Sequence, residues 1–207
     1  LLFSYGLFNK NINNLKIAKN LFVLSIKKYP SKINSYILLA EILRKENNVS
    51  DAIKALNAAK KIDEFNSEID YNLAISYKTI KSFREALVFI DDAVKKQPEN
   101  KIYKILKADI LIDCFQDEKA QELLCNLKLK KDSLLHFQSE ILISKIFINQ
   151  KNYKLAEEIL LKLKKIFSKQ KILYLNLSDL YFKSKELEKG ISILKEGIEN
   201  FPKFIPL

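Results

Sequence analysis

Alanine recurs along this chain at an almost constant interval of 34 residues. The members of the series are Ala18, Ala52, Ala86, Ala120, Ala156 and Gly190. One interval is 36 residues, and the last member is glycine in place of alanine. A fixed interval of this length predicts tandem structural repeats, each of which packs on its neighbours. With the alanine at position 20, the repeats cover residues 1–32, 33–66, 67–100, 101–134, 137–170 and 171–204. Leu135 and His136 fall outside the count and are interpreted as a linker.

Each repeat is predicted to contain two helices, helix A and helix B, joined by a polar turn. In repeat 2, apolar residues recur at three- and four-residue spacing from Tyr36 to Leu43 and again from Ala52 to Ala59. Residues 46–48 form the turn between them. Pro30 and Pro98 lie two periods apart, so the register does not rest on alanine alone.

Positions 8 and 27 also carry small residues in most repeats. Position 8 is Gly6, Ala40, Ala74, Ala108, Ser144 and Ser178, and position 27 is Ser25, Ala59, Ala93, Leu127, Leu163 and Gly197. Helices approach closely only where their crossing point carries little side chain, so these positions predict where helices A and B meet. The two leucines predict a local change of superhelical pitch. Gly190 and Gly197 each cost about 1 kcal/mol relative to alanine, so the last helix is expected to fray unless another group packs on it.

The period, the small positions and the prolines together resemble the tetratricopeptide repeat over essentially the whole chain. The resemblance implies an all-α fold, a right-handed α-solenoid of antiparallel helix pairs. Residues 1–207 would form one elongated domain. Because the last repeat has no polar capping helix, we expect the sequence to be part of a longer chain.

In this family, helix A lines the concave face of the solenoid at positions 2, 5, 6, 9, 12 and 13, and we call this surface the A-helix face. The candidate partner-binding residues transferred to it are Tyr71, Asn72, Ile75, Lys78, Ile105, Asp109, Ile112, Ile141, Lys145, Ile148, Leu175, Asn176, Asp179 and Phe182. Positions 9 and 12 are expected to be the most open. Ile75, Ile112, Ile148 and Phe182 are therefore the sharpest candidates.

Two known binding patterns of the family are incomplete here. The two-carboxylate clamp that grips a chaperone tail needs Lys, Asn, Asn, Lys and Arg at five positions, which here hold Ile37, Glu41, Asn72, Ile102 and Leu106. Only Asn72 fits, so docking of a chaperone tail is disfavoured. A ladder of asparagines at position 6 would hold an extended peptide backbone, but only Asn72 and Asn176 occupy it.

The net charge of +11 raises nucleic acid as a partner, because clustered cations displace counterions from phosphates. Nearly all the cations are lysines, and only Arg44 and Arg84 could supply the guanidinium forks that read bases and phosphates. The lysine clusters at residues 128–131 and 162–165 are interpreted as solvated outer surface. The sequence alone therefore disfavours nucleic-acid binding.

The sequence offers no catalytic residue, metal site or cofactor site. The chain has a single histidine, His136, and three glycines, all of them at predicted helix crossings. Cys114, in a turn, and Cys125, at an outward position of the next helix, are too far apart along the helix to bridge. Two unbridged cysteines suit a reducing compartment, and we expect a cytoplasmic location. No segment is long and apolar enough to predict a membrane span.

The leading hypothesis is a non-catalytic protein–protein interaction scaffold. Its groove would bind a helical or extended apolar segment of a protein or peptide, with Asp109, Lys145 and Asp179 fixing the register. No small-molecule substrate is evident. The alternative is a substrate-recognition arm of a larger enzyme such as a glycosyl- or sulfotransferase. The third hypothesis is an RNA-binding helical repeat, with an affinity that falls steeply with salt.

The groove hypothesis predicts that replacing Ile112 and Ile148 by lysine abolishes partner binding without unfolding the array. The measurement is a pull-down that compares the wild type with the double variant. Normal binding by the variant would contradict the hypothesis.

Overall fold

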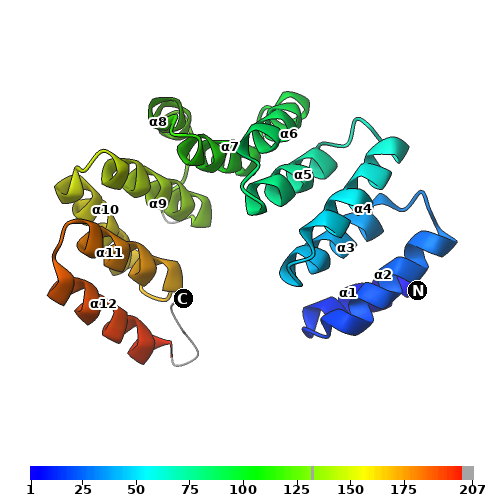
Figure 1. The fold of residues 1–207 in the computed structure, drawn as a ribbon, viewed down its shortest axis with the longest axis horizontal. Helices are drawn as coiled ribbons and strands as arrows, with labels where there is room; N and C mark the ends of the chain where they lie inside the picture. The colour runs from blue at the N-terminus through cyan, green and yellow to red at the C-terminus, as the bar shows by residue number, and fades with distance from the viewer. Residues whose placement is uncertain (132, 202–207) are drawn as a thin grey trace. The chain divides into compact units, whose positions relative to one another are not determined.

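The computed structural model describes residues 1–131 and 133–201 (Figure 1). Within these residues the chain forms twelve α-helices and no strand. In chain order they are α1 (Leu2–Asn11), α2 (Leu15–Lys28), α3 (Ile33–Lys45), α4 (Val49–Ile62), α5 (Ser67–Thr79), α6 (Phe83–Lys96), α7 (Lys101–Asp113), α8 (Asp117–Cys125), α9 (Leu134–Asn149), α10 (Tyr153–Ile166), α11 (Lys171–Lys183) and α12 (Leu187–Asn200). The predicted all-α solenoid of helix pairs is confirmed. Asp132 of repeat 4 and residues 202–204 of repeat 6 lie outside the described residues.

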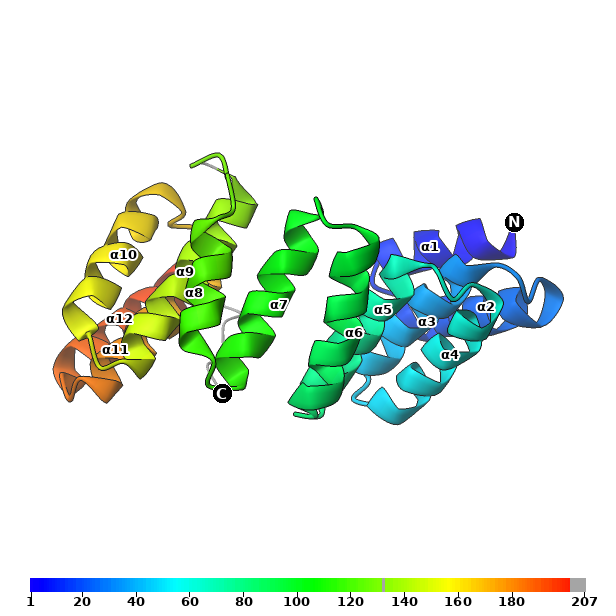
Figure 2. The same ribbon diagram turned by 90° about the horizontal axis from the view of Figure 1, so that it is seen from above.

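The chain divides into two compact units, Leu1–Ile110 and Leu111–Leu207, with the boundary inside α7. In the first unit, α1/α2, α3/α4 and α5/α6 are paired, and α2 packs on α3 as α4 does on α5 (Figures 1 and 2). In the second unit, α9/α10 and α11/α12 are paired, and α11 contacts both α9 and α10. The single elongated domain stays a prediction.

The small residues lie buried where the helices of a repeat cross. All five alanines at position 20 are fully buried, and Gly190 is buried as well. A methyl group on Gly6 would lie 2.9 Å from the Phe22 ring, and one on Gly190 would lie 2.7 Å from the Phe182 ring. These two glycines therefore make room for an aromatic side chain. Because Phe182 packs on Gly190, α12 runs unbroken, and the expected fraying is not seen.

The repeat pattern is altered around the two extra residues. The second helix α8 has 9 residues, whereas α2, α4, α6, α10 and α12 each have 14. The linker interpretation of Leu135 and His136 is wrong, because both lie in the first turn of α9. Ser133 caps this helix, and its Oγ accepts a hydrogen bond from the His136 N–H at 3.1 Å. A serine at this position favours helix initiation, so α9 begins before the predicted repeat boundary.

The turn between the two helices of every repeat has the same backbone geometry. Position 15 is left-handed, with φ between 58° and 66°, in all six repeats, at Asn13, Asn47, Lys81, Phe115, Lys151 and Lys185. In repeat 2, the Asn48 N–H donates to Leu43 O at 2.8 Å and the Asn47 N–H donates to Arg44 O at 3.0 Å. The other five repeats make the same two bonds, which define a Schellman motif. Backbone hydrogen bonds therefore close each turn, although none has the glycine that this conformation favours.

Phe115 gives a test of the strain in these turns. It is almost fully exposed, so its ring gains little from packing, and a bulky residue with positive φ is strained. Phe115→Gly should raise the free energy of unfolding by about 0.5–1 kcal/mol, after allowing for the greater entropy of glycine in the unfolded chain. Urea unfolding followed by circular dichroism measures the change.

Phe65→Gly is the matched control for this prediction. Phe65 is similarly exposed in a turn, but its backbone is not left-handed, so the substitution should not stabilise the protein. Equal effects of the two substitutions would contradict the strain interpretation.

Candidate functional site

Ion pairs connect consecutive first helices across the A-helix face of the first unit. Lys10 Nζ lies 2.6 Å from Glu41 Oε2, which joins α1 to α3. Lys78 Nζ lies 3.1 Å from Asp109 Oδ2, which joins α5 to α7. In both pairs a lysine at position 12 meets a carboxylate at position 9 of the next repeat. Asp109, predicted to meet a partner, is thus engaged within the chain.

Arg44 makes the corresponding connection between α3 and α5. Its Nη2 donates to Asn72 Oδ1 at 3.0 Å, and its Nη1 donates to Ser76 Oγ at 3.2 Å. Asn72 Nδ2 donates in turn to Glu68 O at 2.8 Å, and the Asn72 side chain is buried. Asn72 therefore serves the contact between repeats, and its role in partner binding stays a prediction.

In the second unit the A-helix face combines one such pair with exposed apolar side chains. Lys145 Nζ of α9 lies 3.0 Å from Asp113 Oδ1. On α11, Asp179 pairs with Lys183 of the same helix at 2.9 Å, and both side chains are about half exposed. Ile172 is 45% exposed and Phe182 is 39% exposed.

Several residues predicted to line the groove belong to the core. Ile112 and Ile148, at position 12, are 2% and 4% exposed, and Ile105 is also buried. Ile148 packs in an apolar cluster with Ala156 and Leu160. The expectation that position 12 is open is therefore wrong for Ile112 and Ile148. A lysine there would place a charge in the core, so the double variant proposed from the sequence would unfold rather than report on binding.

The other candidates lie at intermediate depth. Tyr71 and Ile75 on α5, Ile141 on α9, and Leu175 and Asn176 on α11 are half-buried. The Tyr71 ring stacks on the Tyr103 ring, with their centroids 4.9 Å apart. Of the fourteen candidates, the structure brings Leu175, Asn176, Asp179 and Phe182 together on one face of α11.

The charge pairs between repeats were not predicted, although the sequence contains their signal. Lys10 and Glu41, like Lys78 and Asp109, have opposite charges at positions 12 and 9 of successive repeats. The signal relates two different positions of successive repeats, so it does not appear when each position is compared only with its own equivalents.

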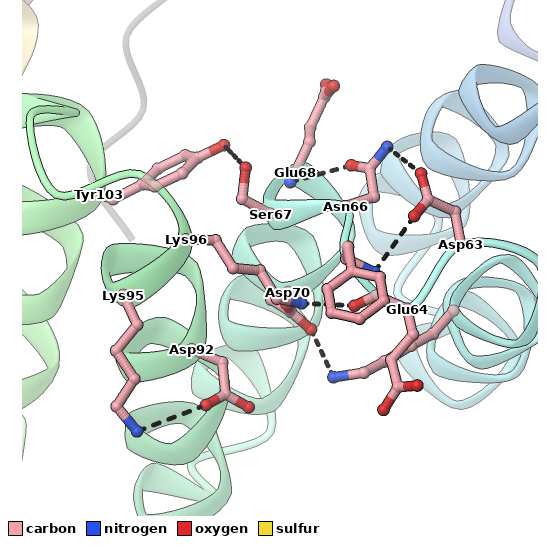
Figure 3. Close-up of polar contacts among 12 residues, drawn as sticks. Asp63, Glu64, Asn66, Ser67, Glu68, Asp70, Asp92, Lys95, Lys96 and Tyr103 are labelled. Atoms are coloured by element: carbon pink, nitrogen blue, oxygen red, sulfur yellow. Dashed lines mark hydrogen bonds and ion pairs between the residues drawn. The ribbon is translucent and has the colours of Figure 1, made fainter.

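A buried carboxylate is a second feature that was not predicted from the sequence. Asp70 of α5 has no exposed surface, and its oxygens lie 2.6 Å from Lys60 Nζ of α4 and 2.5 Å from Lys96 Nζ of α6. Lys96 also donates to Glu64 O (Figure 3). A buried ion needs such partners, so Asp70 ties three helices together.

A shallow hollow of about 440 Å³ lies beside this cluster. Its lining residues are Phe65, Asn66, Ser67, Glu68, Lys96, Gln97 and Tyr103. The Asn66 side chain accepts from the Glu68 N–H, and Ser67 Oγ lies 3.3 Å from the Tyr103 hydroxyl (Figure 3). These polar groups are engaged with one another, so the hollow gives no sign of a ligand.

Two further findings concern only the described part of the chain. Among residues 1–131 and 133–201, no three His, Cys, Asp or Glu side chains gather as a metal site would require. None of the helices described is both long enough and apolar enough to cross a bilayer.

Comparison with known proteins identifies the repeats. The sequence profile of the tetratricopeptide repeat matches residues 33–66 and 173–204. No curated protein sequence matches the chain. The two matched segments are therefore tetratricopeptide repeats, and the twelve helices described fit about six units of this kind. Repeats of this kind generally mediate protein–protein interaction, and proteins built from them are generally non-catalytic scaffolds.

Solved structures share the fold at low sequence identity. A tetratricopeptide repeat protein from Parabacteroides merdae aligns with 99% of this chain and 79% of its own, at 18% identity and a TM-score of 0.76. The Pseudomonas aeruginosa protein pilF aligns with 98% of this chain and 91% of its own, at 15% identity and a TM-score of 0.70. YrrB, described as having an unusual peptide-binding site, aligns with 88% of this chain and 93% of its own, at 17% identity and a TM-score of 0.57.

The Glu41 ion pairs predict a dependence of stability on pH. Burial raises the pKa of the Glu41 carboxyl, but the hydrogen bonds from Lys10 and Lys45 together prevail and hold that pKa below its ordinary value. Because the pKa is lowered in the folded state, the ion pairs stabilise the protein at pH values above the ordinary carboxyl pKa of about 4.3. This contribution, at most about 1 kcal/mol for partly exposed groups, is lost as the pH falls through the folded pKa.

Urea unfolding of the wild type and Glu41→Gln at neutral pH and near pH 3 measures this effect. Glu41→Gln should be less stable than the wild type at neutral pH, and the difference should shrink near pH 3. The exposed Glu99→Gln is the control and should show little difference at either pH. A Glu41→Gln difference that does not change with pH would refute the role of the ion pairs.

Proposed function

We propose that this protein is a non-catalytic interaction scaffold that binds a helical or extended apolar segment of a partner on the A-helix face of α11. The observation that carries the proposal is the exposure of Ile172 and Phe182 on this face. The fold supports it, because tetratricopeptide repeats generally mediate protein–protein interaction. The peptide-binding site named for YrrB is consistent with this class of function.

The spacing of the side chains on α11 suits an amphipathic partner. Ile172, Leu175, Asp179 and Phe182 follow one another at intervals of three or four residues, and Asn176 lies four residues after Ile172. The five residues therefore share one side of the helix. Three of the five are apolar, and two of these three are substantially exposed. A partner helix with apolar residues at i, i+3 or i+4, and i+7 would cover them.

Electrostatics favour a cation on the partner beside this apolar surface. Asp179 is paired only weakly, because Lys183 is on the same helix and both groups are well exposed. A lysine or arginine of the partner could replace Lys183 at little cost. Lys145, by contrast, is held by Asp113, and we assign it a structural role in place of the predicted contact with the partner.

The first unit fits this role less well. Its A-helix face carries the pairs of Lys10 with Glu41 and of Lys78 with Asp109, together with the Arg44 hydrogen bonds. A partner would have to break these contacts or bind above them. We therefore assign partner binding to α11 rather than to the middle of the chain.

The test is a selection of peptides from a random displayed library, followed by measurement of affinity by fluorescence anisotropy. Selected peptides should carry apolar residues at helical spacing next to a lysine or arginine. Ile172→Asp should weaken their binding at least about tenfold, the effect expected when an unpaired charge replaces an apolar contact.

Leu155→Asp on α10 is the matched control, because Leu155 is exposed to a similar degree but lies on a second helix. It should bind the selected peptides like the wild type. Equal affinity of Ile172→Asp and wild type would overturn the proposal. The salt dependence of the affinity separates peptide binding from RNA binding. An affinity for RNA would fall steeply as salt rises, whereas an affinity that depends on apolar contacts would not.

A further inference from the structure

Positive charge is concentrated on and around α10. Residues 151–171, which contain α10 and the residues that flank it, include seven lysines, two glutamates and no aspartate. This stretch has a net charge of +5 and supplies nearly half of the +11 of the chain. Like charges at this density repel one another, so the stretch favours an anionic partner.

Two charged side chains of this stretch serve contacts inside the second unit. Lys164 Nζ lies 2.5 Å from Glu196 Oε2 of α12. Glu157 Oε1 accepts a hydrogen bond from the Tyr181 hydroxyl of α11 at 2.7 Å. One lysine and one glutamate of α10 are therefore engaged with the helices that follow it.

Three other lysines of α10 have no such contact. Lys154, Lys162 and Lys165 are exposed, and within the part of the chain that the structure describes none of them makes an ion pair. On α6, by contrast, the exposed Lys95 lies 3.8 Å from Asp92 of the same helix. The excess of unpaired charge on α10 is therefore not a feature that every second helix shares.

Exposed apolar side chains border the three lysines. Leu155, Leu161 and Ile166 are 40%, 38% and 55% exposed. At about 3.6 residues per turn, the lysines lie in the middle of the exposed side of α10, with Leu161 along one edge and Leu155 and Ile166 along the other. The exposed Glu158 lies among the lysines and offsets one of their charges. We call this surface, a strip of lysines between two apolar edges, the α10 outer face.

We propose that the α10 outer face binds an acidic helical segment of a partner protein. Carboxylates of the segment meet Lys154, Lys162 and Lys165, and apolar residues beside them cover Leu155 and Ile166. From Lys154 to Lys165 the face extends about 16 Å along α10, so about three turns of a partner helix match it. This surface takes a partner of opposite charge to the one proposed for α11, and neither proposal depends on the other.

The order of the side chains favours a protein segment over a membrane or a nucleic acid. A helix that lies in a membrane surface has one continuous apolar face with cations at its borders, whereas here the lysines are central and the apolar residues lie at the edges. A phosphate backbone would pair with the lysines but would leave Leu155 and Ile166 without an apolar contact. The face also has no arginine, the side chain that binds phosphate as a fork.

The first experiment selects peptides of about 16 residues, long enough for more than three helical turns, from a random displayed library on the 207-residue chain. A class of acidic peptides should be enriched, with carboxylates and apolar residues at helical spacing. This class differs in charge from the peptides expected on α11, so one selection distinguishes the two surfaces. The absence of an acidic class would overturn the proposal.

Removing the three lysines tests where the acidic peptides bind. Lys154→Gln/Lys162→Gln/Lys165→Gln keeps side chains that favour a helix. Fluorescence anisotropy should show the acidic peptides binding this variant at least about tenfold more weakly, because three ion pairs are lost. Ile172→Asp on α11 should leave their affinity unchanged. Equal affinity of the triple variant and the wild type would place the peptides elsewhere and overturn the proposal.

Lys54→Gln/Lys61→Gln/Lys95→Gln is the matched control, because it removes three exposed lysines from second helices of the first unit and lowers the net charge equally. It should bind the acidic peptides like the wild type. Circular dichroism establishes that each variant keeps its helical content. If the control weakens binding as much as the α10 variant, the peptides respond to the charge of the whole chain, and the α10 outer face is not the site.

A last variant separates a protein segment from other anions. Leu155→Gln/Ile166→Gln should weaken peptide binding about fivefold, because two apolar contacts are lost. An unchanged affinity would contradict the role of the apolar edge. Single-stranded RNA and phosphatidylserine vesicles are measured in parallel with the wild type and the lysine variant. Tighter binding to either of them than to the peptides, through the same lysines, would overturn the assignment to a protein segment.

Discussion

Close approach of the two helices within each repeat is the constraint on which the rest of the structure depends. It requires small residues at positions 8 and 20, and the alanines at position 20 are completely buried. Once the helices meet there, larger apolar residues such as Leu56 and Leu160 fill the space on either side. Where an aromatic ring occupies that space, as with Phe22 and Phe182, the small residue is reduced to glycine.

Polar contacts then select how one repeat meets the next. The pairs of Lys10 with Glu41 and of Lys78 with Asp109 lie across the surface that the family uses for recognition. Charges on this surface are therefore not all available to a partner. In the first unit, these internal contacts close the A-helix face. On α11, by contrast, Ile172 and Phe182 remain accessible.

The helices could be predicted from the sequence because the features that define them recur at a fixed interval. The second helices begin at Leu15, Val49, Phe83, Asp117, Tyr153 and Leu187, at the same intervals as the alanine series. The left-handed turns could not be predicted, because backbone hydrogen bonds impose them on residues as unlike as Asn47 and Phe115.

The burial of Ile112 and Ile148 could not be predicted either, since the exposure of a side chain at a given position depends on the neighbouring helices. Of the candidate site, the α11 residues could be placed on one face by spacing, whereas the intramolecular partners of Asp109 and Lys145 could not.

Among the residues that the structure describes, Asp70 is the only buried carboxylate, and it distinguishes the junction of α5 with α4. Its carboxylate fits only where lysines reach it from α4 and from α6. If α5 docked on α2 instead of α4, so that repeat 2 was skipped, Asp70 would face Ile26 in place of Lys60, and a buried charge would lose half of its compensation. Repeats of similar size and pattern are prone to such misassembly during folding. Asp70 therefore disfavours an array in which repeat 3 follows repeat 1, and it helps to fix the order in which the repeats stack.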